Sequence, residues 1–208
     1  MTNTMWWYLT RSAGLVAWVL LVLTLLWGTL VAGRLAPAGR ARRWLVDLHP
    51  YLGAVGLAAL GLHGTAAVMD TTVGMQWVNT VVPFTSAWRP SAVASGVLAV
   101  WCLAAVEITS MARRRLGRRT WRRVHFLSYA AAALMTLHAM TAGTDATNPI
   151  VEGVLLVGTA VAAVAITCRA LAARTTGQPP EGRSLTASPG AARLSAPGLM
   201  DRIKLRRV

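Results

Sequence analysis

Five long apolar segments restrict what this chain can fold into more than any other feature. Each is close to the ~20 residues that a tilted helix needs to cross a bilayer. Hydrophobic residues make up 55% of the sequence and charged residues only 13%, which is too apolar for an ordinary soluble domain. The predicted spans are residues 14–32, 48–69, 92–111, 124–142 and 150–170. We therefore expect an all-α membrane protein, built as a bundle of five transmembrane helices.

The basic residues predict the orientation of this bundle. Of the 21 Lys and Arg residues, 19 lie between the first two spans, between the third and fourth, or at and beyond the end of the last. Only Arg11 and Arg89 fall on the other side. The positive-inside rule assigns the richer face to the cytoplasm, so the N-terminus is expected outside and the C-terminus inside. No nucleic-acid-binding motif accompanies the arginines, so the net charge of +14 is attributed to topology.

Two segments outside the spans also carry predictions. Residues 173–208 are rich in Pro, Gly, Ser and Arg and show little periodicity, which is typical of a disordered tail. The domain division is therefore a membrane domain over 1–172 and a basic cytoplasmic tail over 173–208. The external connection over 70–90 contains Trp77 and Trp88. We expect it to lie along the outer interface and partly to cap whatever binds there.

The chain has only four histidines, and all four lie in apolar stretches. His49 and His63 are 14 residues apart in the second span, and His125 and His138 are 13 apart in the fourth. At about 1.5 Å of rise per residue, each spacing is roughly 20 Å along a helix. The two spans run in the same direction, so one histidine of each lies near the cytoplasmic end and one nearer the outer end. A buried ionisable side chain is costly without a partner, which indicates a function for the pairs.

Two level pairs of imidazoles suit two planar cofactors stacked across the bilayer. Neutral imidazole is a common iron ligand, and a heme between two helices takes one histidine from each. The prediction is an inner heme held by His49 and His125 and an outer heme held by His63 and His138. Neither cysteine matches a heme-attachment spacing, so both hemes are expected to be b-type.

Only one of the two histidine spacings places both rings on nearly the same face of an ideal α-helix. Fourteen residues return to nearly the same face, whereas 13 leave the second histidine roughly 140° away. The fourth span therefore needs a local irregularity, such as a π-bulge, or hemes approached from different sides. In the second span, Gly53, Gly56 and Gly61 either leave room for a macrocycle or serve helix packing.

Arginines at the cytoplasmic ends of the two histidine-bearing spans are candidates for contact with the inner heme. Arg43, Arg122 and Arg123 could pair with its propionates. Most of the arginine cluster is better explained as the topology signal and as a docking surface for an acidic flavoprotein.

These features resemble the ferric reductase-like transmembrane domain shared by ferric reductases and NADPH oxidases. The resemblance runs from about residue 10 to 142. It rests on the paired histidines and on RRRLGRRTWRRVHFLSY over 113–129, which is similar to the family's basic loop and ligand-bearing helix. The opening LTRSAGLVAWVL over 9–20 is similar to the family's first core helix. There the arginine lies close to the outer heme, so the resemblance implies that role for Arg11, the alternative being an interfacial snorkelling charge.

The family moves electrons from cytoplasmic NADPH through flavin and two b-type hemes to an acceptor outside. After Ala170 no glycine-rich phosphate-binding turn follows, so we expect a member without the flavin and NADPH domain. Its donor would be a separate flavoprotein reductase, bringing the flavin, or quinol. Its acceptor would be ferric iron or a partner reductase, as for the membrane heme subunit of the bacterial methionine sulfoxide reductase system. Ala67 stands where oxidase members place a further histidine, which weakens a superoxide-producing role.

The predicted function is thus electron relay by the heme-bearing membrane component of an oxidoreductase, with no bond-making catalytic residue. The rival prediction is a heme-free transporter or channel whose histidines line a polar path. The residues between His49 and His63 are almost wholly apolar, which disfavours a wet pathway. A third hypothesis is a membrane anchor that has lost its cofactor. The Ala- and Arg-rich, Lys-poor usage suggests a bacterium with GC-rich DNA, and hence the bacterial plasma membrane.

Overall fold

The computed structural model describes residues 2–32, 40–143 and 148–175, and every regular element in these ranges is a helix. The helices are α1 (Asn3–Ala32), α2 (Arg40–Met69), α3 (Trp77–Val81), α4 (Pro90–Met111), α5 (Arg118–His125), α6 (Leu127–Ala142) and α7 (Pro149–Thr175). Four stretches are long and apolar enough to cross a membrane: Asn3–Ala32, Val46–Met69, Pro90–Met111 and Pro149–Leu171. Four of the five predicted spans are thereby confirmed as long apolar helices.

The span predicted over 124–142 differs from the other four, because it is divided between two helices. Helix α5 carries the arginine run and ends at His125, and α6 begins at Leu127. Helix α6 has 16 residues, fewer than the ~20 that cross a bilayer unaided. The expected single apolar helix is therefore a basic helix joined to a shorter apolar one.

The junction at Phe126 is a local irregularity between the two histidines of the fourth predicted span. The N–H of Tyr129 donates to the carbonyl of Phe126 at 3.1 Å, an i to i−3 hydrogen bond of the 3₁₀ kind. A 3₁₀ turn advances about 20° more per residue than an α-helix, so 13 residues cover more rotation and the second histidine returns toward the face of the first. Within the described residues the irregularity at this junction is a turn of the 3₁₀ kind, in place of the π-bulge given as an example.

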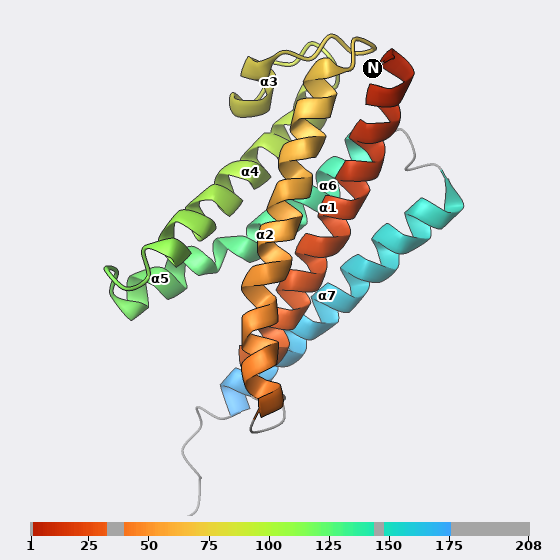
Figure 1. Cartoon of the computed structure of the whole chain (residues 1–208). Helices are drawn as coiled ribbons and strands as arrows, with labels where there is room; N and C mark the ends of the chain where they lie inside the picture. The colour runs from red at the N-terminus through yellow and green to blue at the C-terminus, as the bar shows by residue number, and fades with distance from the viewer. Residues whose placement is uncertain (1, 33–39, 144–147, 176–208) are drawn as a thin grey trace, which may run out of the picture.

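The helices pack as two close pairs, α1 with α2 and α4 with α6, and α7 lies against α1 and α6 (Figure 1). The main buried cluster joins α1 to α7, with side chains of α6 packed against it; its buried members are Trp18, Val22, Leu25, Leu155 and Ala162. Trp18 also donates from Nε1 to Oγ1 of Thr136 on α6 at 3.0 Å. The apolar core thus lies on the α1, α6 and α7 side of the bundle.

The connection from α2 to α4 lies at the end of the bundle that carries the N-terminus, and the start of α2 and the end of α7 lie at the opposite end (Figure 1). Asn3 anchors it, because its Oδ1 accepts hydrogen bonds from the N–H and the hydroxyl of Thr71 at 2.9 and 3.0 Å. Trp101 of α4 donates from Nε1 to the carbonyl of Val81 at the end of α3, at 2.9 Å. Trp77 is exposed, as an interfacial position requires.

The tail predicted over 173–208 lies almost entirely outside the described residues. Helix α7 continues to Thr175, three residues beyond the predicted boundary of the membrane domain. The loop between α1 and α2, residues 33–39, also lies outside the described residues.

Candidate functional site

The fold brings the four histidines together as two pairs. The ring centroids of His49 on α2 and His125 on α5 are 6.2 Å apart. Those of His63 on α2 and His138 on α6 are 6.1 Å apart. These are the two pairs that the sequence indicated.

The spacing within each pair is compatible with one metal ion between the two rings. A bond from a first-row metal to an imidazole nitrogen is about 2.0–2.1 Å, and the ring centre lies roughly 1.1 Å behind that nitrogen. Two rings on opposite sides of one ion therefore have centroids about 6.3 Å apart. Aromatic contacts without a metal span 4.5–7 Å as well, so the spacing alone does not decide between the two.

The hydrogen bonds of the histidines favour a ligand role. Nδ1 of His49 lies 3.0 Å from the carbonyl of Thr24, and Nδ1 of His63 lies 2.7 Å from that of Thr10. Nδ1 of His138 lies 2.8 Å from the carbonyl of Ala92. A carbonyl accepts only, so each Nδ1 carries the proton and each Nε2 keeps its lone pair. Metal-ligating histidines are oriented in the same way, by donating their other N–H to a carbonyl or carboxylate.

Each of these three rings also lies against a glycine of the neighbouring helix. A Cβ atom on Gly28 would lie 2.9 Å from Cε1 of His49, and one on Gly14 would lie 2.8 Å from Nδ1 of His63. On Gly96 it would lie 2.8 Å from Nδ1 of His138. Real Cβ atoms do not approach so closely, so the ring reaches the helix backbone only because glycine stands there.

The carbonyl and the glycine belong together, because the glycine always follows the accepting residue by four positions. We call this combination a seat: Thr10 with Gly14, Thr24 with Gly28, and Ala92 with Gly96. The two seats on α1 are 14 residues apart, which is the spacing of the two histidines on α2. The seats fit the histidines of an antiparallel neighbour at both levels.

The glycines that sequence reasoning selected have other surroundings. A Cβ on Gly56 would meet Leu21 of α1 at 3.0 Å, so this residue serves helix packing. A Cβ on Gly53 would have ordinary contact with Thr24, and one on Gly61 would meet nothing within 4 Å. The recurrence of Thr and Gly 14 residues apart in α1 was the signal that could have identified the seats.

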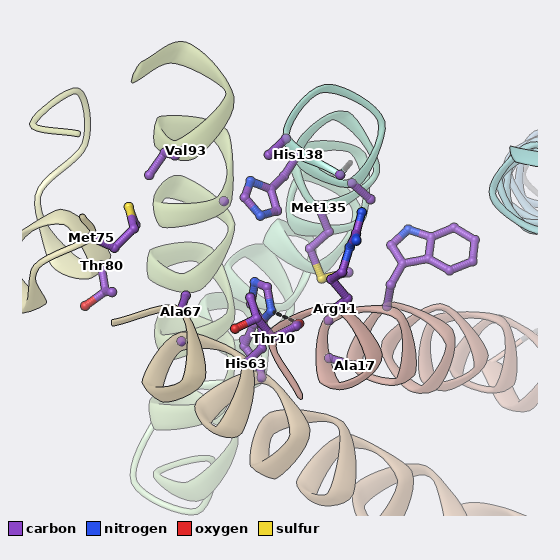
Figure 2. A pocket seen from close by; sticks show the side chains of 18 of the residues that line it. Thr10, Arg11, Ala17, His63, Ala67, Met75, Thr80, Val93, Met135 and His138 are labelled. Carbon is purple, nitrogen blue, oxygen red and sulfur yellow. Dashed lines mark hydrogen bonds between the residues drawn. The ribbon is translucent and has the colours of Figure 1, made fainter. Parts of the chain in front are cut away.

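The outer pair borders a cavity of about 570 Å³, within the ~300–1,000 Å³ common for cofactor sites. Figure 2 shows His63 and His138 directed toward a common space, with Arg11 and Met135 beside it. The guanidinium carbon of Arg11 lies 3.8 Å from the centre of the Trp7 ring. The lining is mostly apolar, with a few polar side chains on the α3 side such as Asp70, Asn79 and Thr80. The cavity thus combines an apolar body, two imidazoles and one cation.

A family model described as "Ferric reductase like transmembrane component" matches residues 13–136 of the chain. The chain belongs to this family. No curated protein and no solved structure matches it. The matched segment contains three of the four histidines, and His138 follows two residues after its end. Ferric reductase-like membrane domains are associated with electron transfer across membranes and generally bind heme.

The residues of this ferric reductase-like domain fit a heme better than a bare metal ion. Within the described ranges, no group of three or more His, Cys, Asp or Glu side chains could hold a metal ion. Two imidazoles would give an ion only two protein ligands, and a porphyrin would bring the remaining nitrogen ligands with it. The apolar cavity at the outer pair offers space for such a group between the helices.

The arginines of the candidate site occupy different environments. Arg11 lines the outer cavity and is only partly exposed. Arg123 lies in the last turn of α5, two residues before His125, and is exposed, as are Arg122 and Arg43. Arg11 is thus enclosed beside its histidine pair, whereas the arginines near the inner pair remain at the surface.

Proposed function

We propose that this protein carries electrons across the bacterial plasma membrane through two b-type hemes. His49 and His125 would hold the inner heme, and His63 and His138 the outer heme. The observation that carries this proposal is the pair of histidine couples with centroids 6.2 and 6.1 Å apart, three of whose four rings donate Nδ1–H to a helix carbonyl. This arrangement fixes the Nε2 lone pairs for a metal.

When bound, heme supplies reversible one-electron chemistry, and the protein determines where it lies and how easily it is reduced. With two histidines holding each heme, the iron would have no position open to oxygen or a substrate, and we assign no bond-making catalytic residue to the chain. Its side chains bind, orient and exclude water. Arg11, beside the outer pair, is suited to a propionate, and Arg123 is placed at the same end as the inner pair.

The direction of transfer follows from the orientation of the bundle. With the arginine-rich helix α5 on the cytoplasmic side, the pair containing His125 receives electrons and the pair containing His138 passes them outward. The donor is a cytoplasmic flavoprotein reductase or quinol. The acceptor is ferric iron or a partner reductase outside, and a methionine sulfoxide reductase-like partner belongs to this class. The exposed arginines of α5 offer an acidic flavoprotein a docking surface.

The test is a visible difference spectrum, dithionite-reduced minus oxidised, of the purified protein with a heme-to-protein ratio. We expect two low-spin b hemes per chain, and His63→Ala and His125→Ala should each remove a different one. A wild-type protein that stays colourless when produced with ample heme would contradict the proposal. A heme-free transporter or channel would then be the better explanation of the four histidines.

A further inference from the structure

The fourth histidine is held differently from the other three. Nδ1 of His125 is buried, and no hydrogen-bond partner for it exists among the described residues. A buried imidazole N–H without an acceptor loses the orienting contact that its three counterparts have.

The sequence of α4 explains why a seat is missing here. By the spacing of the histidines, the second seat on α4 falls 13 or 14 residues after Ala92 and Gly96. Its carbonyl would belong to Ala105 or Val106, and its glycine would stand at 109 or 110. These two positions hold Thr109 and Ser110, so a side chain fills the space that a ring would need.

The hydroxyl of Thr109 also turns back onto the two candidate carbonyls. Oγ1 of Thr109 donates to the carbonyl of Ala105 at 2.7 Å and lies 3.1 Å from that of Val106. The side chain of Thr109 thus lies over both carbonyls, and within the described residues no hydrogen bond joins Nδ1 of His125 to the α4 backbone.

Trp121, one turn before His125 on α5, provides a different support. Its ring stacks on the imidazole with centroids 5.0 Å apart and an interplanar angle of 30°. Its Nε1 donates to Oγ of Ser110 on α4 at 3.4 Å. The same serine that replaces a seat glycine thus accepts the hydrogen bond that ties the stacked ring to α4.

We propose that Trp121 is the positioning residue of His125, fixed by Ser110, and that this stacked clamp replaces the carbonyl and glycine seat of the other three histidines. The inference rests on the proposed heme function. Its consequence is that the inner site depends on a ring contact at one of its two histidines, whereas the outer site has a directed hydrogen bond at both.

The experiment compares Trp121→Leu, Trp121→Phe and Ser110→Ala with wild type, each purified with bound heme. The readouts are the low-spin EPR signal of each heme and the rate at which each heme passes to apomyoglobin. The His63→Ala and His125→Ala variants assign the signals. Trp101→Leu is the matched control, because Trp101 also bonds through Nε1 to a neighbouring segment and stacks on no histidine.

In Trp121→Leu we expect a shifted inner signal and about ten-fold faster loss of the inner heme, with the outer heme unchanged, since losing an outer-shell partner costs ~10–100-fold in metal affinity. Trp121→Phe should keep most of the wild-type behaviour, because it retains a ring. Ser110→Ala should shift the inner signal less than Trp121→Leu does.

An inner signal and loss rate equal to wild type in Trp121→Leu would overturn the inference, and so would equal effects on both hemes or the same effects in Trp101→Leu. If the Trp121→Leu protein does not insert into the membrane, the Ser110→Ala variant provides the test. An inner-heme EPR signal equal to wild type in Ser110→Ala would then overturn the inference. A wild-type protein without two low-spin signals contradicts the proposed function instead, before any variant is compared.

Discussion

A Cβ atom on Gly14 would lie 2.8 Å from Nδ1 of His63, the atom that is hydrogen-bonded to the carbonyl of Thr10 at 2.7 Å. Gly14→Ala should therefore push the ring from its seat and break this bond. We predict a ~10–100-fold loss of outer-heme affinity with the inner heme retained, measured as heme per protein and by difference spectra.

Alanine favours a helix over glycine by about 1 kcal/mol, so a loss in Gly14→Ala would not arise from a weaker helix. Gly153→Ala on α7 is the control, because a Cβ there meets nothing within 4 Å. Equal outer-heme content in the two variants would show that the seat does not hold His63.

The hydrogen bond from Trp18 to Thr136 joins α1 to α6 across the buried core. Thr136→Val keeps the side-chain shape and removes the acceptor, leaving a buried indole N–H unsatisfied. We predict a loss of about 1 kcal/mol in the free energy of unfolding, the size of an interhelical hydrogen bond in a membrane protein. Denaturation in mixed micelles measures it. Thr167→Val is the control, since Thr167 bonds only its own helix and is exposed; equal stability of the two variants would refute the prediction.

Arg11 places a positive charge in the cavity beside the outer histidine pair. A cation stabilises the reduced, more electron-rich state of a nearby redox centre, so Arg11→Gln should lower the midpoint potential of the outer heme. A change of about 1 kcal/mol corresponds to roughly 40 mV for a one-electron couple. A redox titration followed optically checks this. Arg11→Lys should keep most of the wild-type midpoint potential. An outer-heme potential that is the same in Arg11→Gln as in wild type would show that the Arg11 charge does not act on this heme.

The orientation of the bundle can be tested by cysteine labelling. Cys102 and Cys168 are first replaced by serine, and single cysteines are introduced as Thr85→Cys or Arg115→Cys, both at exposed positions. An impermeant maleimide should label the position at 85 in intact cells and the position at 115 only after permeabilisation. The reverse pattern would invert the proposed direction of electron transfer.

Hydropathy predicted most of the spans because apolar length is a local property of the sequence. It missed that α5 begins at Arg118, since a run of arginines gives no apolar signal although arginine is a good helix former. For the same reason α2 begins at Arg40, eight residues before the predicted span. The 13-residue spacing of His125 and His138 predicted an irregularity in the fourth span. It did not predict that this would be a tightened turn at Phe126.

Pairing the histidines required only their spacing and the direction of their helices. The seats could not be found in that way, because threonine and glycine are ordinary residues in membrane helices. Their meaning depends on which carbonyl faces which ring across two helices, as for Ala92 and His138. The clamp at Trp121 could not be predicted from the sequence either, because it depends on α4 having Ser110 in place of a seat glycine.

The two seats on α1 affect the alignment of α1 with α2 as well as the orientation of each histidine ring. Because Gly14 and Gly28 repeat with the same interval as His63 and His49, a slip of α1 past α2 by one residue would unseat both rings together. Helix α1, which carries no histidine itself, therefore sets the register of α2 at both levels of the site at once.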